Sequence, residues 1–335
     1  MKLATIKDIA KRLGINHGTV SRALRNDPKV NIKTRELVQK TAEEMDYTPN
    51  MAAKGLARGK SNTIAIVTFS YFTTFTSELM RGIEPEMLKT SYDMLYYTTS
   101  RYTNIGTQGR EAYIFEKILN EKRAEALIIF SGPLFGKPGI IERYRQAGIQ
   151  LIFIEGKNSW GHRVHYDNIA AGEMAVKHLL ERKREKIGLL TGNTTGVLSF
   201  KERKEGFLNA LYTAGRQASN NIYEFQEDSP EMIRNGLNFF IKNNVGGVYT
   251  AASDPYALRL MQEAKKMGLR VPEDLAVVGQ DDTVASQAAE ITTIRQPIAE
   301  MGRKAVEIAV KALTEKDAPM MDEMFYPELI IRRTT

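Results

Sequence analysis

The sequence predicts an α/β protein in which a small all-α segment precedes a larger core of parallel sheets covered by helices. From Thr63 onward, short apolar stretches of strand length alternate with amphipathic stretches of helix length. This alternation is typical of parallel strands joined by helices that lie on both faces of a sheet. Before Thr63 the periodic stretches have helical spacing. At 335 residues the chain is long enough for two or three domains.

Two short helices joined by a tight turn are predicted at the N-terminus. Thr5 is a candidate N-cap. The apolar residues that follow at spacings of three and four form one face: Ile6, Ile9, Ala10 and Leu13. Gly14 ends this helix, because glycine adopts the left-handed conformation at little cost. Asn16 caps the second helix, whose inward-facing residues are Val20, Ala23 and Leu24. Its exposed residues are His17, Gly18, Thr19, Ser21 and Arg22.

This pattern is typical of a helix-turn-helix that reads DNA, although the spacing alone also fits a helical hairpin in an ordinary core. The charge distribution favours DNA. Residues 1–60 hold 13 Lys and Arg against 6 Asp and Glu, whereas residues 61–335 hold 34 of each class. The whole net charge of +7 therefore lies on the segment that would meet phosphates, where release of counterions drives binding.

A third helix is predicted after its N-cap Asn31, with a buried face formed by Leu37, Val38, Ala42 and Met45. Pro49 ends it, because the residue before a proline disfavours helical conformation. The following stretch, Met51–Ser61, is rich in alanine but short, and Gly55 weakens it further. We therefore expect this segment to become helical only when another molecule holds it. The predicted segments are a headpiece at 1–48, a hinge helix and linker at 49–61, and a core at 62–335.

The core alternates strands and helices, and such sheets bind ligands beyond the carboxyl ends of their strands. The predicted strands are Thr63–Phe69, Asp93–Thr98, Ala126–Phe130, Leu151–Ile154, Lys186–Leu190, Gly247–Thr250 and Leu275–Val278. The predicted helices are Ser77–Leu88, Gly109–Asn120, Ile140–Ala147, Ala170–Leu180, Lys201–Ala214, Glu231–Lys242, Tyr256–Met267 and Ile298–Leu313.

Composition excludes several classes of protein. The chain has no cysteine, which rules out disulfides and thiolate metal sites and suits a reducing compartment. No apolar run approaches 18 residues and no secretory signal is evident, so we expect a cytoplasmic protein with no membrane partner. The four histidines form no spaced zinc motif, and neither a phosphate loop nor a nucleophile elbow is present. Because Asp281 and Asp282 are adjacent, we expect their side chains to diverge on extended backbone. We therefore expect no enzyme, no cofactor and no metal.

Ordered motifs along nearly the whole chain match one family. In the first 60 residues these are Thr5–Ala10, Thr19–Leu24, Thr34, Arg35, Tyr47–Asn50, Ala53 and Leu56. In the core they are Leu79–Glu84, Asp167, Asn168, Arg203–Phe207, Ala252–Asp254, Val271–Asp274, Val277–Gly279, Asp281, Asp282 and Thr292–Pro297. The chain thereby resembles the lactose-repressor (LacI/GalR) family of bacterial transcriptional regulators.

The resemblance implies a dimeric repressor whose core has two doubly wound parallel-sheet subdomains, like a periplasmic sugar-binding protein, around a ligand cleft. The implied borders place about 62–159 and 291–320 in the first subdomain, and about 160–290 and 321–335 in the second. A C-terminal strand is expected at Glu328–Ile331. The chain stops at Thr335 without leucine heptads, so we expect a homodimer.

Residue chemistry and resemblance together assign the DNA contacts. Arg22 suits a bidentate contact to a guanine edge, with a phosphate contact as the alternative. His17 and Gly18 occupy the positions that vary sequence preference in the family. Side chains suited to phosphate contacts, of which three also cap helices, are Thr5, Asn16, Thr19, Ser21, Asn31, Thr34, Tyr47 and Asn50. By resemblance Leu56 wedges into the minor groove, flanked by Lys54 and Arg58. The alternative is a Leu56 packed onto the core.

Resemblance also implies polar cleft residues for a sugar-like effector: Glu155, Arg203, Ser253 and Asp281. Phe72, Phe75 and Phe130 are candidate apolar walls. Alternatively Arg203 and Asp281 pair with each other and the phenylalanines belong to the core. The chain departs from the family pattern at Thr73–Thr76 and at Gln280, so the effector's identity does not carry over.

The sequence thus predicts a repressor of a carbohydrate-utilisation operon that binds a palindromic operator. Its effector is expected to be a sugar, sugar acid or sugar phosphate that acts as an inducer or as a corepressor. The alternative is a cytoplasmic sugar-binding protein or sugar-processing enzyme without operator function.

Overall fold

A computed structural model describes residues 4–48, 61–70, 73–99, 107–130, 139–156, 160–216, 221–315 and 317–335. The chain divides into two compact units, Met1–Ser61 and Asn62–Thr335. Among the described residues, no helix has the length and apolar character needed to cross a membrane.

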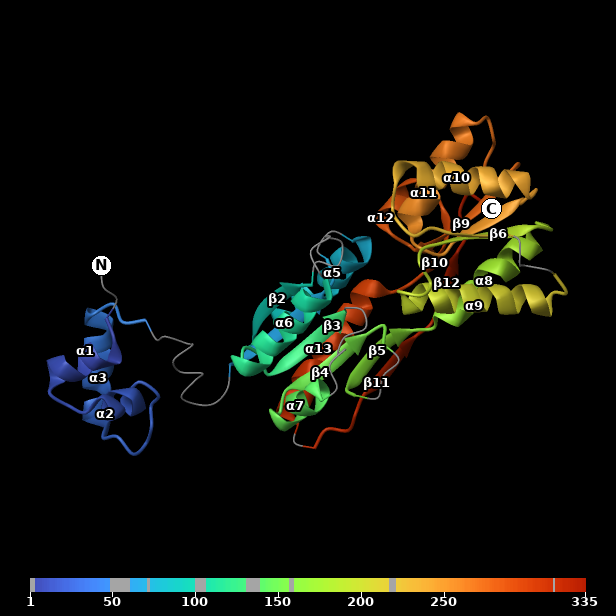
Figure 1. Ribbon diagram of the computed structural model, residues 1–335. Coiled ribbons are helices and arrows are strands. Elements are labelled where there is room, and N and C mark those ends of the chain that lie inside the picture. The colour runs from blue at the N-terminus through green and yellow to red at the C-terminus, as the bar shows by residue number, and fades with distance from the viewer. Residues whose placement is uncertain are drawn as a thin grey trace. The chain divides into compact units, whose positions relative to one another are not determined.

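Within residues 4–48 the first unit contains three helices, α1 (Ile6–Leu13), α2 (His17–Ala23) and α3 (Ile32–Glu44) (Figure 1). They enclose a small apolar core that includes Ile9, Val20 and Val38. One predicted core position is wrong, because Leu37 is 53% exposed. Thr41, one turn further along α3, is buried. Thr41 is accommodated because its hydroxyl donates a 2.8 Å hydrogen bond to the Leu37 carbonyl.

The caps of these helices are those that the sequence predicts. The Thr5 hydroxyl accepts a hydrogen bond from the Asp8 N–H, and the Asp8 carboxylate accepts one from the Thr5 N–H, which completes a capping box. Asn16 and Asn31 each accept a hydrogen bond from the backbone two residues further on. Gly14 ends α1 in the left-handed conformation, with φ of 63°.

The described strands of the second unit form two sheets of six. The first has the order β11 (Asp322–Phe325), β5 (His162–Tyr166), β4 (Gln150–Ile154), β3 (Ala126–Phe130), β1 (Thr63–Thr68), β2 (Asp93–Thr98). The second has the order β12 (Glu328–Ile330), β10 (Thr292–Arg295), β9 (Ala276–Asp281), β8 (Gly247–Thr250), β6 (Ile187–Thr191), β7 (Ile222–Glu224). Neighbouring strands are parallel except β10 and β12. The predicted α/β class with two parallel-sheet subdomains is confirmed.

The helices of this unit alternate with its strands. They are α5 (Thr74–Met87), α6 (Thr107–Asn120), α7 (Ile140–Gln146), α8 (Asn168–Glu181), α9 (Leu198–Thr213), α10 (Pro230–Lys242), α11 (Asp254–Lys266), α12 (Val284–Ala288) and α13 (Ile298–Thr314). Strands β1, β6, β8 and β9 are buried along their whole length, as expected for parallel strands covered on both faces.

The sequence pattern missed β5, β7, β10, β11 and α12. Strand β5 alternates apolar and polar residues and carries two histidines, and β11 is mostly exposed at a sheet edge, so neither has the continuous apolar run of a central strand. The C-terminal strand implied by resemblance is present as β12.

Three predicted subdomain borders are also wrong, because each chain crossing lies a few residues later. β5 belongs to the first sheet, β10 to the second and β11 to the first. The chain therefore leaves the first sheet after Tyr166, returns after Arg295 and leaves again after Phe325. Since β10 and β11 are short and lack a strong apolar pattern, no local signal in the sequence marks the sheet to which they belong.

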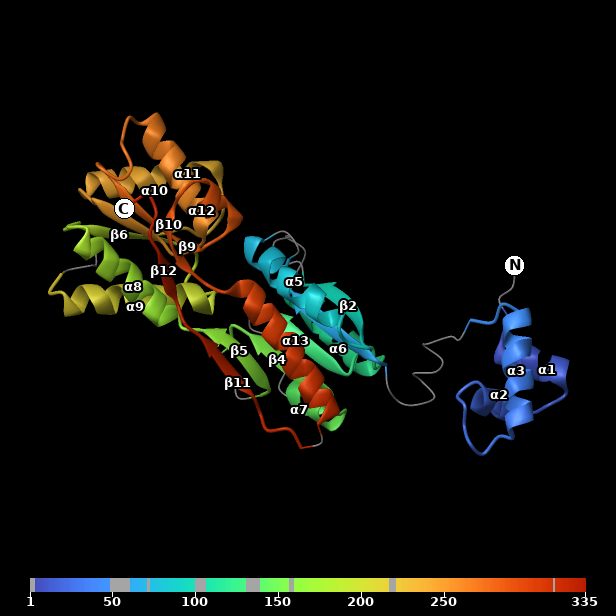
Figure 2. The ribbon, with the colours of Figure 1, turned by 180° about the vertical axis from the view of Figure 1, so that it is seen from behind.

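Each subdomain contains a pair of helices that cross with their backbones in contact, α5 with α13 and α8 with α9 (Figures 1 and 2). A Cβ atom on Gly82 would lie 1.7 Å from the Ala299 carbonyl oxygen, and one on Gly206 would lie 1.9 Å from the Ile169 carbonyl oxygen. No larger residue fits at these crossings without moving a helix.

We expect Gly206→Ala to destabilise the core by about 1–3 kcal/mol or more, because its methyl group must displace the backbone of α8. The matched control is Gly196→Ala, whose Cβ would meet nothing closer than 3.9 Å. Denaturant unfolding of the two variants checks this. Equal stability of both would contradict a rigid contact between α8 and α9.

Candidate functional site

The surface predicted to read DNA is the start of α2 and the turn before it. His17 and Arg22 are exposed, and Gly18, Thr19 and Ser21 are partly exposed. The Arg22 Nε donates to the Gly18 carbonyl oxygen at 3.3 Å, so the side chain lies along its own helix. A helix of this kind presents its first turns to the edges of bases in the major groove.

The candidate phosphate contacts divide into two groups. Thr5, Asn16 and Asn31 each cap a helix, because their side chains accept a hydrogen bond from a backbone N–H of its first turn. Thr34 is partly exposed, and Tyr47 packs against the headpiece core, where burial raises the pKa of its hydroxyl. Five predicted site residues lie outside the described part of the chain: Asn50, Lys54, Leu56, Arg58 and Phe72.

In the second unit, four side chains close a ring of hydrogen bonds between the two sheets. Asn168 Nδ2 donates to Glu155 Oε2 at 2.9 Å, and Gln296 Nε2 donates to Glu155 Oε1 at 2.8 Å. Arg203 Nε donates to Asn168 Oδ1 and its Nη2 to Gln296 Oε1, both at 2.8 Å. The two amides thus connect a carboxylate to a guanidinium, and we call these four residues the ring.

The ring lies where the chain crosses between the sheets. Glu155 directly follows β4 of the first sheet, and Arg203 lies in α9 of the second subdomain. Asn168 and Gln296 lie at two chain crossings, just after β5 and β10. A third hydrogen bond, 2.8 Å from Arg203 Nη1 to the Ala251 carbonyl oxygen, fixes the guanidinium to the end of β8. All these strand ends are carboxyl ends, as the fold predicts for a ligand site.

The predicted cleft residues Glu155, Arg203 and Asp281 come together here. Asp281 Oδ1 lies 3.8 Å from Arg203 Nη2. Asp281 has φ of 100°, Asp282 55° and Glu155 59°, values that residues other than glycine rarely adopt and that cluster at functional sites. The expectation of extended backbone at Asp281 and Asp282 is therefore wrong, although their side chains do diverge.

Several buried polar atoms of the second sheet make no hydrogen bond of good geometry within the described part of the chain. They are Thr191 Oγ1, Ser253 Oγ, Gln280 Nε2 and Asp281 Oδ1. All four lie at or just beyond the carboxyl ends of β6, β8 and β9. Burial raises the pKa of Asp281, against the opposing effects of Arg203, Ser253 and Gln280. Buried polar atoms are nearly always satisfied, so this group suits a polar ligand.

Two of the aromatic candidates, Phe75 and Phe130, pack against each other. Phe75 of α5 and Phe130 at the end of β3 stack with ring centroids 4.2 Å apart and an interplanar angle of 22°. Both are partly buried against the core, which supports the core alternative for these two residues. Tyr249 was not predicted, and its hydroxyl donates to Gln280 Oε1 at 2.6 Å.

Sequence reasoning missed Asn168 and Gln296 as cleft residues. Both stand in stretches that matched the family, yet an amide carries no distinctive chemistry until its partners are known. Their function as bridges depends on bringing together positions that are 141 residues apart for Glu155 and Gln296.

Two carboxyl groups of this region, those of the partly buried Glu155 and the buried Asp254, hold their protons unusually strongly. Burial raises the pKa of Glu155 from 4.5 to about 7, although Arg203 and Asn168 oppose it. Burial and the nearby Asp281 raise the pKa of Asp254 from 3.8 to about 7. Asp254 accepts hydrogen bonds of 2.7 Å from the Thr293 hydroxyl and the Thr283 N–H.

The folded protein therefore keeps protons that the unfolded chain has released, and we expect the free energy of unfolding to fall as the pH rises from about 4.5 to about 7. The Glu155→Gln variant has no charge to titrate at this position, so its free energy of unfolding should fall less over the same pH range. The fall that remains in this variant is due to Asp254. Denaturant unfolding at several pH values measures this. The control is Glu185→Gln on the exposed surface; the same pH dependence in both variants would refute a protonated Glu155.

Comparison with known proteins identifies both units. Residues 5–50 match the family described as bacterial regulatory proteins, lacI family, and residues 176–335 match the periplasmic binding protein-like domain. The NTD biosynthesis operon regulator NtdR of Bacillus subtilis (strain 168) is 31% identical, over 99% of this chain and 100% of that protein.

Solved structures agree on the fold. The lac repressor dimer bound to operator and the anti-inducer ONPF superposes with a TM-score of 0.80 at 24% identity, over 99% of both chains. The complex of the transcriptional regulator CelR with cellobiose has a TM-score of 0.69 at 21% identity, over 99% of this chain and 100% of that one. With a matching headpiece, a matching core and a full-length relative, the chain belongs to the lacI family of bacterial DNA-binding transcriptional regulators.

Proposed function

We propose that this regulator represses transcription as a homodimer on a palindromic operator, and that a sugar-like effector in the cleft controls its affinity for that operator. The observation that carries the proposal is the ring of Glu155, Asn168, Arg203 and Gln296. It spans two chain crossings between the sheets and adjoins Asp281, whose buried Oδ1 makes no hydrogen bond of good geometry among the described residues. A ligand there changes the relative placement of the subdomains.

The operator contact is proposed for α2 and the hinge. Arg22 reads a guanine, and His17 or the backbone at Gly18 contacts the neighbouring base. The capping residues of the headpiece position it on phosphates, as do Thr19, Ser21, Thr34, Tyr47 and Asn50. In the hinge, Leu56 inserts into the minor groove between Lys54 and Arg58. The net charge of +7 on residues 1–60 supplies an electrostatic attraction to the phosphates of DNA of any sequence.

The effector contact is proposed for Arg203, Asp281, Glu155 and Ser253. Hydroxyl groups of a sugar donate and accept, so they suit a site that offers both amides and carboxylates. Similarity to the CelR–cellobiose complex supports a sugar as the ligand of this chain as well. We propose no catalytic activity, because the cleft carboxylates face amides and a guanidinium. A place in the cytoplasm follows from this function.

We expect Arg22→Ala to lower the affinity for the selected operator by about 5- to 150-fold, because each bidentate contact to a guanine is worth about 1–3 kcal/mol. Affinity for bulk DNA should fall much less. Fluorescence anisotropy with the operator and with random competitor DNA measures both. The control is Arg216→Ala, an exposed arginine of the core. An operator preference that survives Arg22→Ala would exclude a base contact by this residue.

We expect one or more members of a panel of sugars, sugar acids and sugar phosphates to raise the melting temperature of the protein and to shift operator affinity by about 5- to 150-fold. Arg203→Lys should abolish both effects, because lysine cannot form the planar pattern of donors that arginine uses. Circular dichroism checks that the variant folds. An effector that still acts on folded Arg203→Lys would place its site elsewhere.

A further inference from the structure

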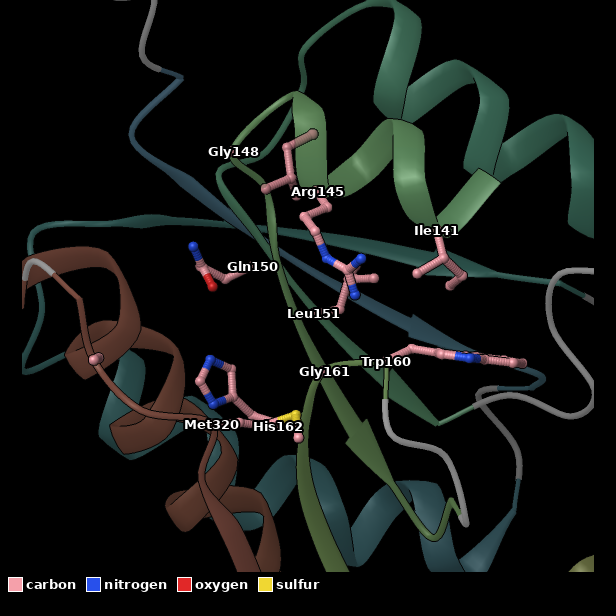
Figure 3. Close-up of a pocket in the computed structure, with 11 residues that line it drawn as sticks. Ile141, Arg145, Gly148, Gln150, Leu151, Trp160, Gly161, His162 and Met320 are labelled. Atoms are coloured by element: carbon pink, nitrogen blue, oxygen red, sulfur yellow. The ribbon is translucent and has the colours of Figure 1, made fainter. Parts of the chain in front are cut away.

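A pocket of about 240 Å³ lies at the end of the first sheet that is opposite the cleft (Figure 3). Its walls come from the end of α7, the starts of β4 and β5, and the stretch before β11. Gln150 is the first residue of β4, whereas Glu155 of the ring follows the last residue of the same strand. The pocket and the ring are therefore separate sites. Because β1, β3 and β4 are parallel and in register, β1 also begins at this end, at Thr63.

The pocket combines a flat apolar wall with donors of hydrogen bonds. Its polar side chains are those of Arg145, Gln150, Trp160 and His162. The remaining lining residues are apolar or glycine: Ile141, Gly148, Ile149, Leu151, Gly161, Ala318 and Met320. None of the lining residues is acidic. In the view of Figure 3, Trp160 lies below the ends of the Ile141 and Arg145 side chains.

His162 directs an unused donor into this pocket. The residue is only 6% exposed. The Met321 N–H donates to its Nδ1 at 3.0 Å. Burial lowers the pKa of the imidazole, which keeps it neutral, so the proton lies on Nε2. Within the described part of the chain Nε2 has no hydrogen-bond partner, and Figure 3 shows the side chains of His162 and Gln150 facing one another. A donor of a largely buried side chain that opens into a pocket suits a ligand that brings an acceptor.

Arg145 adds a positive charge that is available to a ligand. Its Nη1 donates to Glu142 Oε2 at 2.9 Å, but the arginine side chain is 64% exposed. Exposed ion pairs of this kind contribute little to stability, so the guanidinium can exchange this partner for an anion at small cost. Trp160 lines the same pocket and is half exposed, so part of its aromatic surface is accessible to a ligand.

We infer that this pocket is a second ligand site, which binds a small aromatic anion independently of the cleft. The carboxylate of such a ligand is held by Arg145, a further acceptor faces His162 Nε2 and Gln150, and its ring lies against Trp160. The volume lies below the range of about 300–1,000 Å³ for drug-sized ligands, so one ring fits. This site does not depend on the proposed sugar effector, and it lies at the end of the first sheet where β1 begins.

The chain's only tryptophan is Trp160, so tryptophan emission reports on a residue that lines this pocket. We expect sodium benzoate to change the Trp160 emission of the full-length protein in a saturable manner. Benzyl alcohol, which lacks the charge, should bind at least about tenfold more weakly, as expected for the loss of a charge-assisted hydrogen bond.

Arg145→Ala should weaken benzoate by at least about tenfold and leave benzyl alcohol unchanged. Because Arg145 is exposed, this variant should fold, and its melting temperature checks that. Arg216→Ala is the matched control and should bind benzoate as the wild type does. Absence of a saturable change, or equal affinity of Arg145→Ala and wild type for benzoate, would overturn the proposal. Failure of every sugar in the effector panel would leave it intact.

Discussion

The contact between the backbones of α8 and α9 determines the geometry of the ring. A Cβ on Gly172 would lie 2.2 Å from the carbonyl oxygen of Arg203 itself, so the helices approach at the residue whose guanidinium completes the ring. Asn168 lies one turn before Gly172, and Arg203 lies one turn before Gly206. Crossing at the two glycines therefore brings Asn168 and Arg203 within hydrogen-bond distance. In the first subdomain α5 and α13 cross in the same way at Gly82 and Gly302. Because Gln296 lies just before α13, this crossing positions Gln296.

The ring explains how a buried guanidinium and a partly buried carboxyl group coexist without direct contact. Arg203 is buried and Glu155 partly buried, and burial of an unpaired charge is strongly unfavourable. Each amide of the ring accepts from the arginine and donates to Glu155, so both side chains have hydrogen-bond partners while they remain apart. Loss of either bridging amide, Asn168 or Gln296, would remove one hydrogen bond from Arg203 and one from Glu155.

Sequence reasoning predicted the parts whose signals are local. The caps of Thr5, Asn16 and Asn31, the left-handed Gly14 and the central apolar strands all depend on nearby residues, and all are present. It failed where long-range packing decides. Leu37 has an apolar side chain at a helical spacing, yet the headpiece is too small to cover it. The strands β5, β10 and β11 have weak patterns, and their sheet is set by chain crossings that no local signal marks. Resemblance singled out Glu155 and Arg203 of the ring, whereas the bridging amides carried no signal of their own.

The distribution of charge and of buried contacts fits a division of roles between the two units. Residues 1–60 carry the entire net charge of +7, so the attraction to phosphates belongs to the headpiece and linker and is common to all DNA sequences. The core has no net charge with which to add to it. Its influence must therefore act through the placement of the chain it is joined to, and the free energy needed is small. A coupling of about 1–3 kcal/mol changes affinity by about 5- to 150-fold, and one buried hydrogen bond to a charged group is worth about 1.5–3 kcal/mol. Rearrangement of one or two bonds of the ring is thus sufficient to control operator binding, without any change in the headpiece itself.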